Sequence, residues 1–312
     1  METLEIKNRM KGCLYGQAVG DALGLGSEFM SKEECKITYP DGLTQYGQIV
    51  QDAYRRRWPK GAWTDDTDMM LCVLRGFDGI EFNSLRVASN FKEWFNGNPL
   101  DIGSHTYNVL SMEDYTENPE RCASQWWETS NRQSAANGAL MRTSVVGLLP
   151  SNVRSQAEAI CRLTHTDPRC VGSCVIASII IHNLVWKGRM LSPDEVKQIG
   201  EEYDNRISEW LDIAYDSSDI SRLKLDDSDS IGYTLRTLAA AIWCYWHAPT
   251  FEDGLLAVVN EGGDADTNAA ISCAILGAKF GFNHIPAYYA NNLHLRKEYN
   301  QIIETFINKV MA

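Results

Sequence analysis

The 312-residue sequence lacks an excess of basic residues. It contains 29 Lys and Arg against 41 Asp and Glu, which gives a formal net charge of −12. A negative surface repels phosphate, so this balance excludes nucleic-acid binding through a basic face. An apolar fraction of 44% is too high for an intrinsically disordered chain with this charge. The length suits one large domain or two small ones.

Long apolar runs are also missing. The most apolar stretch, residues 175–185, includes His182 and Asn183 and is too short and too polar to span a bilayer. No basic segment leads into an apolar one near the N-terminus, which argues against a signal peptide. The nine cysteines include no C-x-x-C pair. We therefore expect free thiols in a reducing, cytoplasmic environment, and a monomer that does not bind membranes.

Strand patterns of useful length are absent, and helical periodicity dominates. From Pro168 onward, apolar side chains recur at spacings of three and four residues, as on the buried face of a helix. Asp167 before Pro168 supplies an N-terminal cap for this helix. Similar patterns predict helices over residues 231–247 and 267–280. The segment 216–230 is polar and is predicted to be an exposed loop.

A stripe of glycines marks the predicted N-terminal helix. The four glycines are spaced by four residues, at Gly12, Gly16, Gly20 and Gly24. Each Gly costs about 1 kcal/mol in a helix interior, so the spacing indicates a face that another backbone approaches closely. No Gly/Ser-rich or Pro-rich linker divides the chain. The sequence predicts an all-α fold, with one compact multi-helix domain over residues 1–312.

Acidic residues gather in two short segments, and each segment leads directly into an apolar helix. The segments are Trp63-Thr64-Asp65-Asp66-Thr67-Asp68 and Gly262-Gly263-Asp264-Ala265-Asp266-Thr267-Asn268. One interpretation is helix capping, because acids and hydroxyls satisfy the free N–H groups of a first turn. A single acid would suffice for that, and several so close together repel one another. Hard oxygen ligands suit Mg²⁺ or Mn²⁺, and two converging clusters could form a two-metal site. The residues alone favour metal binding and leave capping open.

Other motifs for ligand binding fail on specific residues. Asp264, Asp266 and Asn268 match the start of a calcium-binding loop, but Ala269 and Ile275 stand where that loop requires Gly and Glu. A dinucleotide fingerprint, a phosphate-binding P-loop and a nucleophile elbow are all absent from the sequence.

Several longer motifs follow one another along the chain. They are Gly16-x-x-x-Gly20-Asp21-Ala22-Leu23-Gly24 with Glu28, Trp63-Thr64-Asp65-Asp66-Thr67, Asp101-Ile102-Gly103, Asn137-Gly138-Ala139-Leu140-Met141-Arg142, Thr164-His165, Gly232-Tyr233 and Gly262-Gly263-Asp264-Ala265-Asp266-Thr267. In these motifs the chain resembles the ADP-ribosylglycohydrolases. Each motif is weak alone, but their common order and spacing over most of the chain are specific.

The resemblance implies a single all-α domain and a site for two Mg²⁺ ions, with Mn²⁺ as a substitute. The implied metal ligands are Thr64, Asp65, Asp66, Asp264, Asp266 and Thr267. The candidate catalytic residues are Asp101, Glu28 and Asp65. The residues expected to contact ADP-ribose are Asn137, Gly138, Met141, His165, Tyr233 and Gly263. One departure is Ala136, which stands where family members often have Gly before the Asn of the phosphate-binding loop.

The implied function is Mg²⁺-dependent hydrolysis of the bond between ADP-ribose and a protein side chain, with arginine as the favoured linkage. Alternatives are a hydrolase of serine-linked ADP-ribose or of a free ADP-ribosylated small molecule, and a non-catalytic ADP-ribose binder or structural protein. Both acidic clusters are complete, which favours an enzyme. Residues 46–60, with Arg55-Arg56-Arg57, have no counterpart in the family pattern and could form a solvated turn or a basic patch facing the substrate.

Overall fold

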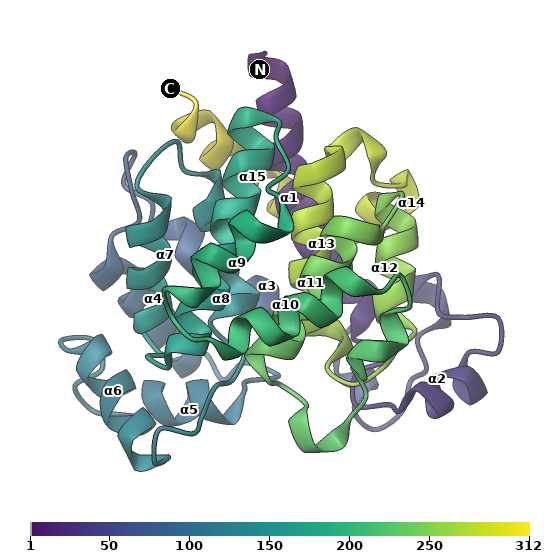
Figure 1. Cartoon of the computed structure of the whole chain (residues 1–312), viewed down its shortest axis with the longest axis horizontal. Coiled ribbons are helices and arrows are strands. Elements are labelled where there is room, and N and C mark those ends of the chain that lie inside the picture. The colour runs from purple at the N-terminus through teal and green to yellow at the C-terminus, as the bar shows by residue number, and fades with distance from the viewer. Residues whose placement is uncertain (1) are drawn as a thin grey trace.

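Fifteen α-helices joined by turns and short 3-10 segments form the computed structural model, which describes residues 2–312 and contains no β-strand in that range. The helices are α1 (Thr3–Gly24), α2 (Lys32–Thr38), α3 (Asp65–Arg75), α4 (Ser84–Asn96), α5 (Ser104–Leu110), α6 (Pro119–Thr129), α7 (Val153–Arg162), α8 (Pro168–His182), α9 (Pro193–Glu201), α10 (Arg206–Asp216), α11 (Thr234–His247), α12 (Phe251–Val259), α13 (Ala265–Phe280), α14 (Ala287–Asn291) and α15 (Arg296–Val310). They pack into one domain with both termini at the same end (Figure 1). The predicted all-α class is confirmed.

Helices α1 and α13 run antiparallel and side by side at the centre of the domain, in contact along the glycine stripe (Figure 1). A Cβ atom on Gly16 would lie 2.1 Å from the carbonyl oxygen of Cys273, and one on Gly20 would lie 2.2 Å from that of Ala269. At the end of α1, a Cβ on Gly24 would lie 2.4 Å from the Cα of Asp266. The predicted close approach of two backbones is therefore confirmed. It brings the C-terminal end of α1 against the acidic first turn of α13.

Replacing Gly16 with Ala should destabilise the fold, because the added methyl group would meet a backbone carbonyl that cannot turn away. Overpacking of this kind costs about 1–3 kcal/mol, and we expect the free energy of unfolding to fall by that amount. Urea denaturation followed by circular dichroism measures it. The matched control is Gly47→Ala, where no heavy atom lies within 4 Å of the added Cβ. Equal stability of the two variants would contradict the packing account.

Helix α8 belongs to the core. Together with the π-turn Asn183–Lys187 it gives a helical segment, Pro168–Lys187, whose length and composition would allow it to cross a membrane. This helical segment is longer than the apolar stretch of residues 175–185 from which the sequence analysis excluded a membrane span. However, 78% of its most apolar window is buried inside the protein, as in a core helix. The predicted cap is present: a carboxylate oxygen of Asp167 accepts the Arg169 N–H at 2.9 Å.

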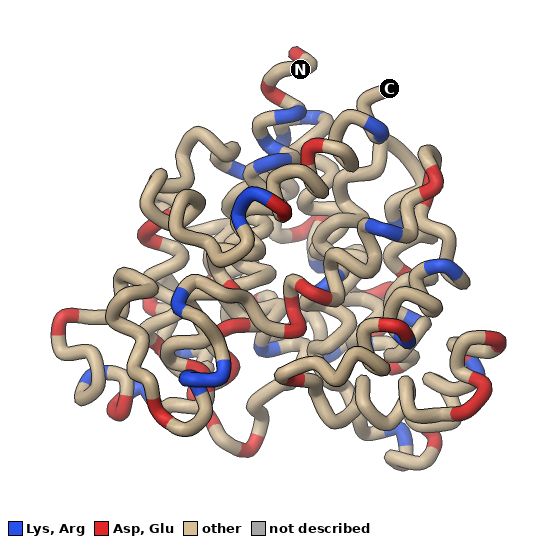
Figure 2. Tube along the Cα trace, turned by 180° about the vertical axis from the view of Figure 1, so that it is seen from behind, with Lys and Arg blue, Asp and Glu red and all other residues tan. Residues whose placement is uncertain are grey.

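The surface carries mixed charge, and one predicted loop is partly buried. Lys and Arg are dispersed among Asp and Glu along the trace (Figure 2). All nine cysteines are buried free thiols. The segment 216–230 contains two short 3-10 turns, and its Leu223 and Leu225 side chains are each 1% exposed. The prediction of an exposed loop is wrong for these leucines, which anchor the segment to the core.

Candidate active site

The two acidic segments meet beside the C-terminal end of α1. Carboxylate oxygens of Asp21, Asp66 and Asp266 lie within 4.8 Å of one another, and the same holds for Glu28, Asp264 and Asp266. Asp266 therefore belongs to both groups. Residues more than 200 positions apart in the sequence thus form one acidic cluster, and each of its two groups could hold a cation.

Neither acidic segment caps its own helix with the side chain at the N-cap position. Thr64 at the start of α3 and Asp264 at the start of α13 make no such hydrogen bond. Instead, Asp21 on α1 caps α3, because its carboxylate accepts the backbone N–H of Thr64 at 2.8 Å and that of Thr67 at 3.0 Å. Asp65 and Asp66 are therefore not needed as caps, which removes the main support for the capping interpretation.

Hydroxyl groups connect the predicted metal ligands. Thr64 Oγ1 lies 3.3 Å from carboxylate oxygens of both Asp66 and Asp266. From the other side, Thr267 Oγ1 donates to Asp66 at 3.1 Å. These four side chains form a single oxygen-only cluster that spans the N-terminal turns of α3 and α13.

No ion pair among residues 2–312 joins a Lys or Arg side chain to a carboxylate of the cluster. Burial is the larger cause and repulsion between neighbouring carboxylates the smaller one, and together they raise the pKa values of Asp65, Asp66 and Asp266 well above the usual range for Asp. The same causes raise the pKa of Glu28. In addition, Asp266 Oδ1 is buried without a hydrogen-bond partner. Buried carboxylates and hydroxyls with an unpaired oxygen fit a hard divalent cation such as Mg²⁺ or Mn²⁺.

A cavity of about 380 Å³ opens beside the cluster, and no Lys or Arg lines it. Ten of the predicted site residues form part of its wall: Glu28, Asp65, Asp101, Asn137, Gly138, Met141, His165, Asp264, Asp266 and Thr267. Thr64 and Asp66 belong to the acidic cluster without lining this cavity. The structure thus brings together residues from six of the predicted motifs, which lie far apart in the sequence.

Two predicted substrate contacts lie outside this cavity wall. Tyr233 lines a neighbouring cavity of about 410 Å³, which shares Gly232 with the first. Gly263 has a φ of 68°, and a Cβ there would lie 1.9 Å from the carbonyl oxygen of Leu225. Its own carbonyl accepts the Phe29 N–H at 2.7 Å. Gly263 therefore shapes the turn that carries Glu28. Contact of Tyr233 or Gly263 with ADP-ribose stays a prediction.

Two stacked imidazoles form part of the same cavity wall. The rings of His105 and His165 are 4.0 Å apart and nearly parallel. Burial, reinforced by repulsion from His105, lowers the pKa of His165 well below its usual range, so the ring is neutral. Its Nδ1 pairs with Thr164 Oγ1 at 2.6 Å, while Nε2 is buried without a partner. A Cβ on Gly138 would lie 2.9 Å from Thr106 Oγ1 and 3.2 Å from this ring, so a side chain would crowd its neighbours at that position.

Residues 46–60 hold site residues in position through hydrogen bonds. The sequence analysis predicted either a solvated turn or a basic patch facing the substrate, and neither describes this role. Tyr54 Oη lies 2.9 Å from a carboxylate oxygen of Glu28 and 2.8 Å from one of Asp101. Arg55 is 5% exposed, and its guanidinium donates to the carbonyls of Leu25 and Gly26 at 3.0 Å. The segment therefore clamps the turn that bears Glu28 and joins the two candidate catalytic carboxyls through one hydroxyl.

Replacing Tyr54 with Phe should lower kcat by about tenfold to a hundredfold. The substitution removes the hydroxyl, whose single proton can donate one hydrogen bond to a carboxylate at a time, a contribution of about 1.5–3 kcal/mol. It keeps the ring that packs against Phe29 and Trp58. The affinity for ADP-ribose, measured by calorimetry, should change little. Tyr107→Phe, at an exposed tyrosine, is the control. An unchanged kcat in Tyr54→Phe would exclude a positioning role.

A family model described as ADP-ribosylglycohydrolase matches residues 2–311. The chain belongs to the ADP-ribosylglycohydrolase family. It is 26% identical to the ADP-ribosylarginine hydrolase Tri1 of Serratia proteamaculans, over 96% of this chain and 79% of that protein. It is also 26% identical to the ADP-ribosyl-[dinitrogen reductase] glycohydrolase of Rhodospirillum rubrum, over 94% of this chain and 92% of that one.

The solved structures support the same assignment at the level of the fold. A chain of an ADP-ribosylglycohydrolase-related protein complex superposes with a TM-score of 0.75 at 24% identity, covering 98% of this chain and 99% of that one. The resemblance stated from the sequence is confirmed. The prediction that the protein is a glycosyl hydrolase is confirmed as well.

Proposed function

We propose that this ADP-ribosylglycohydrolase removes ADP-ribose from arginine side chains of proteins and depends on Mg²⁺. The observation that carries the proposal is the convergence of two acidic helix N-termini on one cavity. That cavity also contains the glycine of the predicted phosphate-binding loop. The name of the Serratia proteamaculans relative, an ADP-ribosylarginine hydrolase, supports arginine as the linkage.

The cavity has a part suited to each end of the ligand. Gly138 has no side chain, so a diphosphate can approach the loop backbone closely. The neutral His165 offers an unpartnered nitrogen for a ribose or phosphate oxygen. Carboxylates also line the cavity, where divalent ions would offset their charge, orient ribose hydroxyls and lower the pKa of a water.

The fixed orientation of Asp101 supports a role as the general base. One carboxylate oxygen accepts the Ile102 N–H at 2.9 Å and the other contacts Tyr54, so the group is held in one orientation. As general base it takes a proton from water while the water oxygen bonds to C1″ of the ribose. The C1″–N bond breaks, and its electron pair stays on the guanidine nitrogen, which then takes up that proton. Glu28, held by the same tyrosine, faces the developing positive charge on the ribose.

Incubation with defined substrates tests the proposal. The enzyme is mixed with peptides carrying arginine-linked or serine-linked ADP-ribose and with a nucleotide-linked small molecule, each with and without Mg²⁺. We expect ADP-ribose release from the arginine-linked peptide when Mg²⁺ is present. Release from only the serine-linked peptide, or from only the small molecule, would show that arginine is not the linkage the enzyme cleaves. Release from none of them would support a non-catalytic binder.

A further inference from the structure

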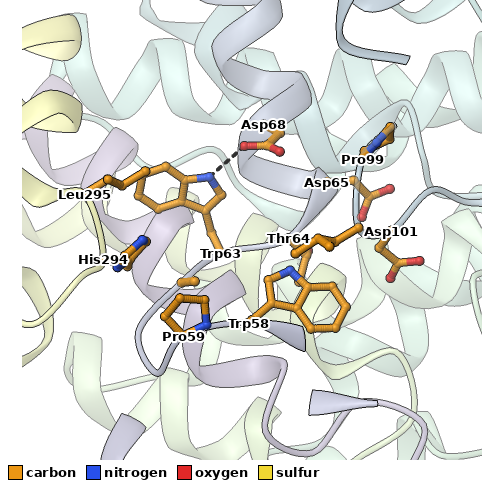
Figure 3. Close-up of a pocket in the computed structure, with 12 residues that line it drawn as sticks. Trp58, Pro59, Trp63, Thr64, Asp65, Asp68, Pro99, Asp101, His294 and Leu295 are labelled. Atoms are coloured by element: carbon orange, nitrogen blue, oxygen red, sulfur yellow. Dashed lines mark hydrogen bonds between the residues drawn. The ribbon is translucent and has the colours of Figure 1, made fainter. Parts of the chain in front are cut away.

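A second cavity adjoins the first on the far side of its carboxylates. Its volume is about 220 Å³, and it shares Asp65 and Asp101 with the larger cavity. Figure 3 shows it extending from these two carboxylates to His294 and Leu295, with the Trp58 and Trp63 indoles between the two ends. The two cavities therefore meet at the carboxylates where cleavage is proposed to occur.

The wall of this second cavity is aromatic, acidic and held in place. Trp63 Nε1 donates to one oxygen of Asp68 at 2.8 Å, and Trp94 Nε1 donates to the other at 3.2 Å. Trp58 is 5% exposed and packs edge-on against Tyr54. No Lys or Arg lines the cavity. The two indoles are thus fixed before any ligand arrives.

The carboxylates of Asp65 and Asp101 lie at the end that joins the larger cavity. Both oxygens of Asp68 are occupied by indole N–H groups. By contrast, no hydrogen bond among residues 2–312 reaches the Asp65 carboxylate. Asp101 also lines this end. A cation entering between the indoles would therefore find its negative partners next to the ribose.

A flat cation fits this combination better than any neutral side chain. A guanidinium stacks on indole faces and pairs with carboxylates through its planar N–H groups. The chain itself shows the first of these contacts, because the Arg57 guanidinium carbon lies 4.4 Å from the ring centre of Trp58. A serine acceptor has neither a charge nor a flat face, and would leave the cavity unfilled.

We propose that this cavity is the acceptor subsite, which holds the guanidinium-bearing side chain while ADP-ribose fills the larger cavity. Trp58 and Trp63 would then determine the linkage that the enzyme accepts. The inference rests on the proposed function and deepens it, because it assigns the leaving group to named residues that the sequence motifs did not single out for substrate.

Trp58 variants test the subsite. In Trp58→Leu we expect kcat/KM for an arginine-linked peptide to fall about tenfold, mainly through KM, since the stacking contact is lost. In Trp58→Phe, which keeps an aromatic face, kcat/KM should stay within about threefold of wild type. The affinity for ADP-ribose should be unchanged in both variants. Trp246→Leu, at a 41% exposed tryptophan of α11, is the matched control.

A pair of inhibitors tests the charge requirement without any mutation. Arginine amide should inhibit the wild-type enzyme, while citrulline amide, its uncharged analogue of the same shape, should not. Inhibition by arginine amide should weaken about tenfold in Trp58→Leu. Equal effects of the two amides, or an unchanged kcat/KM in Trp58→Leu, would overturn the inference. Equal release from serine-linked and arginine-linked peptides would overturn it as well.

Failure of the inference and failure of the proposed function can be told apart. If the wild-type enzyme releases ADP-ribose from neither peptide, the proposed function fails. The cavity is then tested by titrating arginine amide into the protein saturated with ADP-ribose and Mg²⁺. Binding that Trp58→Leu weakens supports the subsite, and absence of binding overturns it.

Discussion

Asp266→Asn should reduce ADP-ribose release by about a thousandfold or more. Asp266 is the residue common to both acidic groups, and its Oδ1 is buried without a partner. Asn keeps the shape and removes the charge, so the domain should still fold while the site loses its central anionic ligand. A thousandfold change corresponds to about 4 kcal/mol of transition-state stabilisation, within the several kcal/mol that metal-ion catalysis supplies.

Two measurements check this expectation. The kcat is determined at saturating Mg²⁺, and the divalent-ion affinity of the purified variant is determined by calorimetry; both should fall. Asp194→Asn is the matched control, because Asp194 also lies in the first turn of a helix but is exposed and lines neither cavity. Wild-type turnover in Asp266→Asn would refute the assignment of Asp266 as a metal ligand.

Asp101→Asn should lower kcat by about a hundredfold to a thousandfold, the usual contribution of a positioned general base. Asn cannot accept the proton of the attacking water, although it can keep a hydrogen bond with Tyr54. Binding of ADP-ribose and of Mg²⁺ should persist, because Asp101 belongs to neither of the two acidic groups at the cluster.

The diagnostic pattern is a loss of kcat without loss of binding. Asp78→Asn is a suitable control, since Asp78 is an exposed loop acid that also accepts backbone N–H groups near it in sequence. Unchanged turnover in Asp101→Asn would remove Asp101 from the catalytic set and leave Glu28 as the candidate base.

Much of the scaffold could be predicted because its signals are local. The glycine stripe of α1 and the periodicity of α8 depend on residues three or four positions apart, and both are confirmed. The acidic turns before α3 and α13 were visible as composition within a few residues. The sequence alone could not show that these turns meet. The resemblance to a family provided that expectation.

The residues to which the sequence analysis assigned no role make their contacts with residues far away in the sequence. Asp21 stands in the first of the motifs, but no local pattern indicates that it caps α3, whose N-cap residue Thr64 lies 43 residues later. Tyr54 and Arg55 lie in a segment without a family counterpart, so their contacts with Glu28 and Leu25 had no signal in sequence. Leu225 is buried where its backbone carbonyl lies close to Gly263, whereas its neighbours in sequence are polar.

Metal dependence is the central claim, and one titration tests it most directly. The purified enzyme is treated with excess chelator and transferred to metal-free buffer. Release of ADP-ribose from an arginine-linked peptide is then followed as Mg²⁺ is added back, with bound metal counted in parallel. We expect no release without metal and full recovery as about two ions bind per chain. Undiminished release in excess chelator would contradict the account.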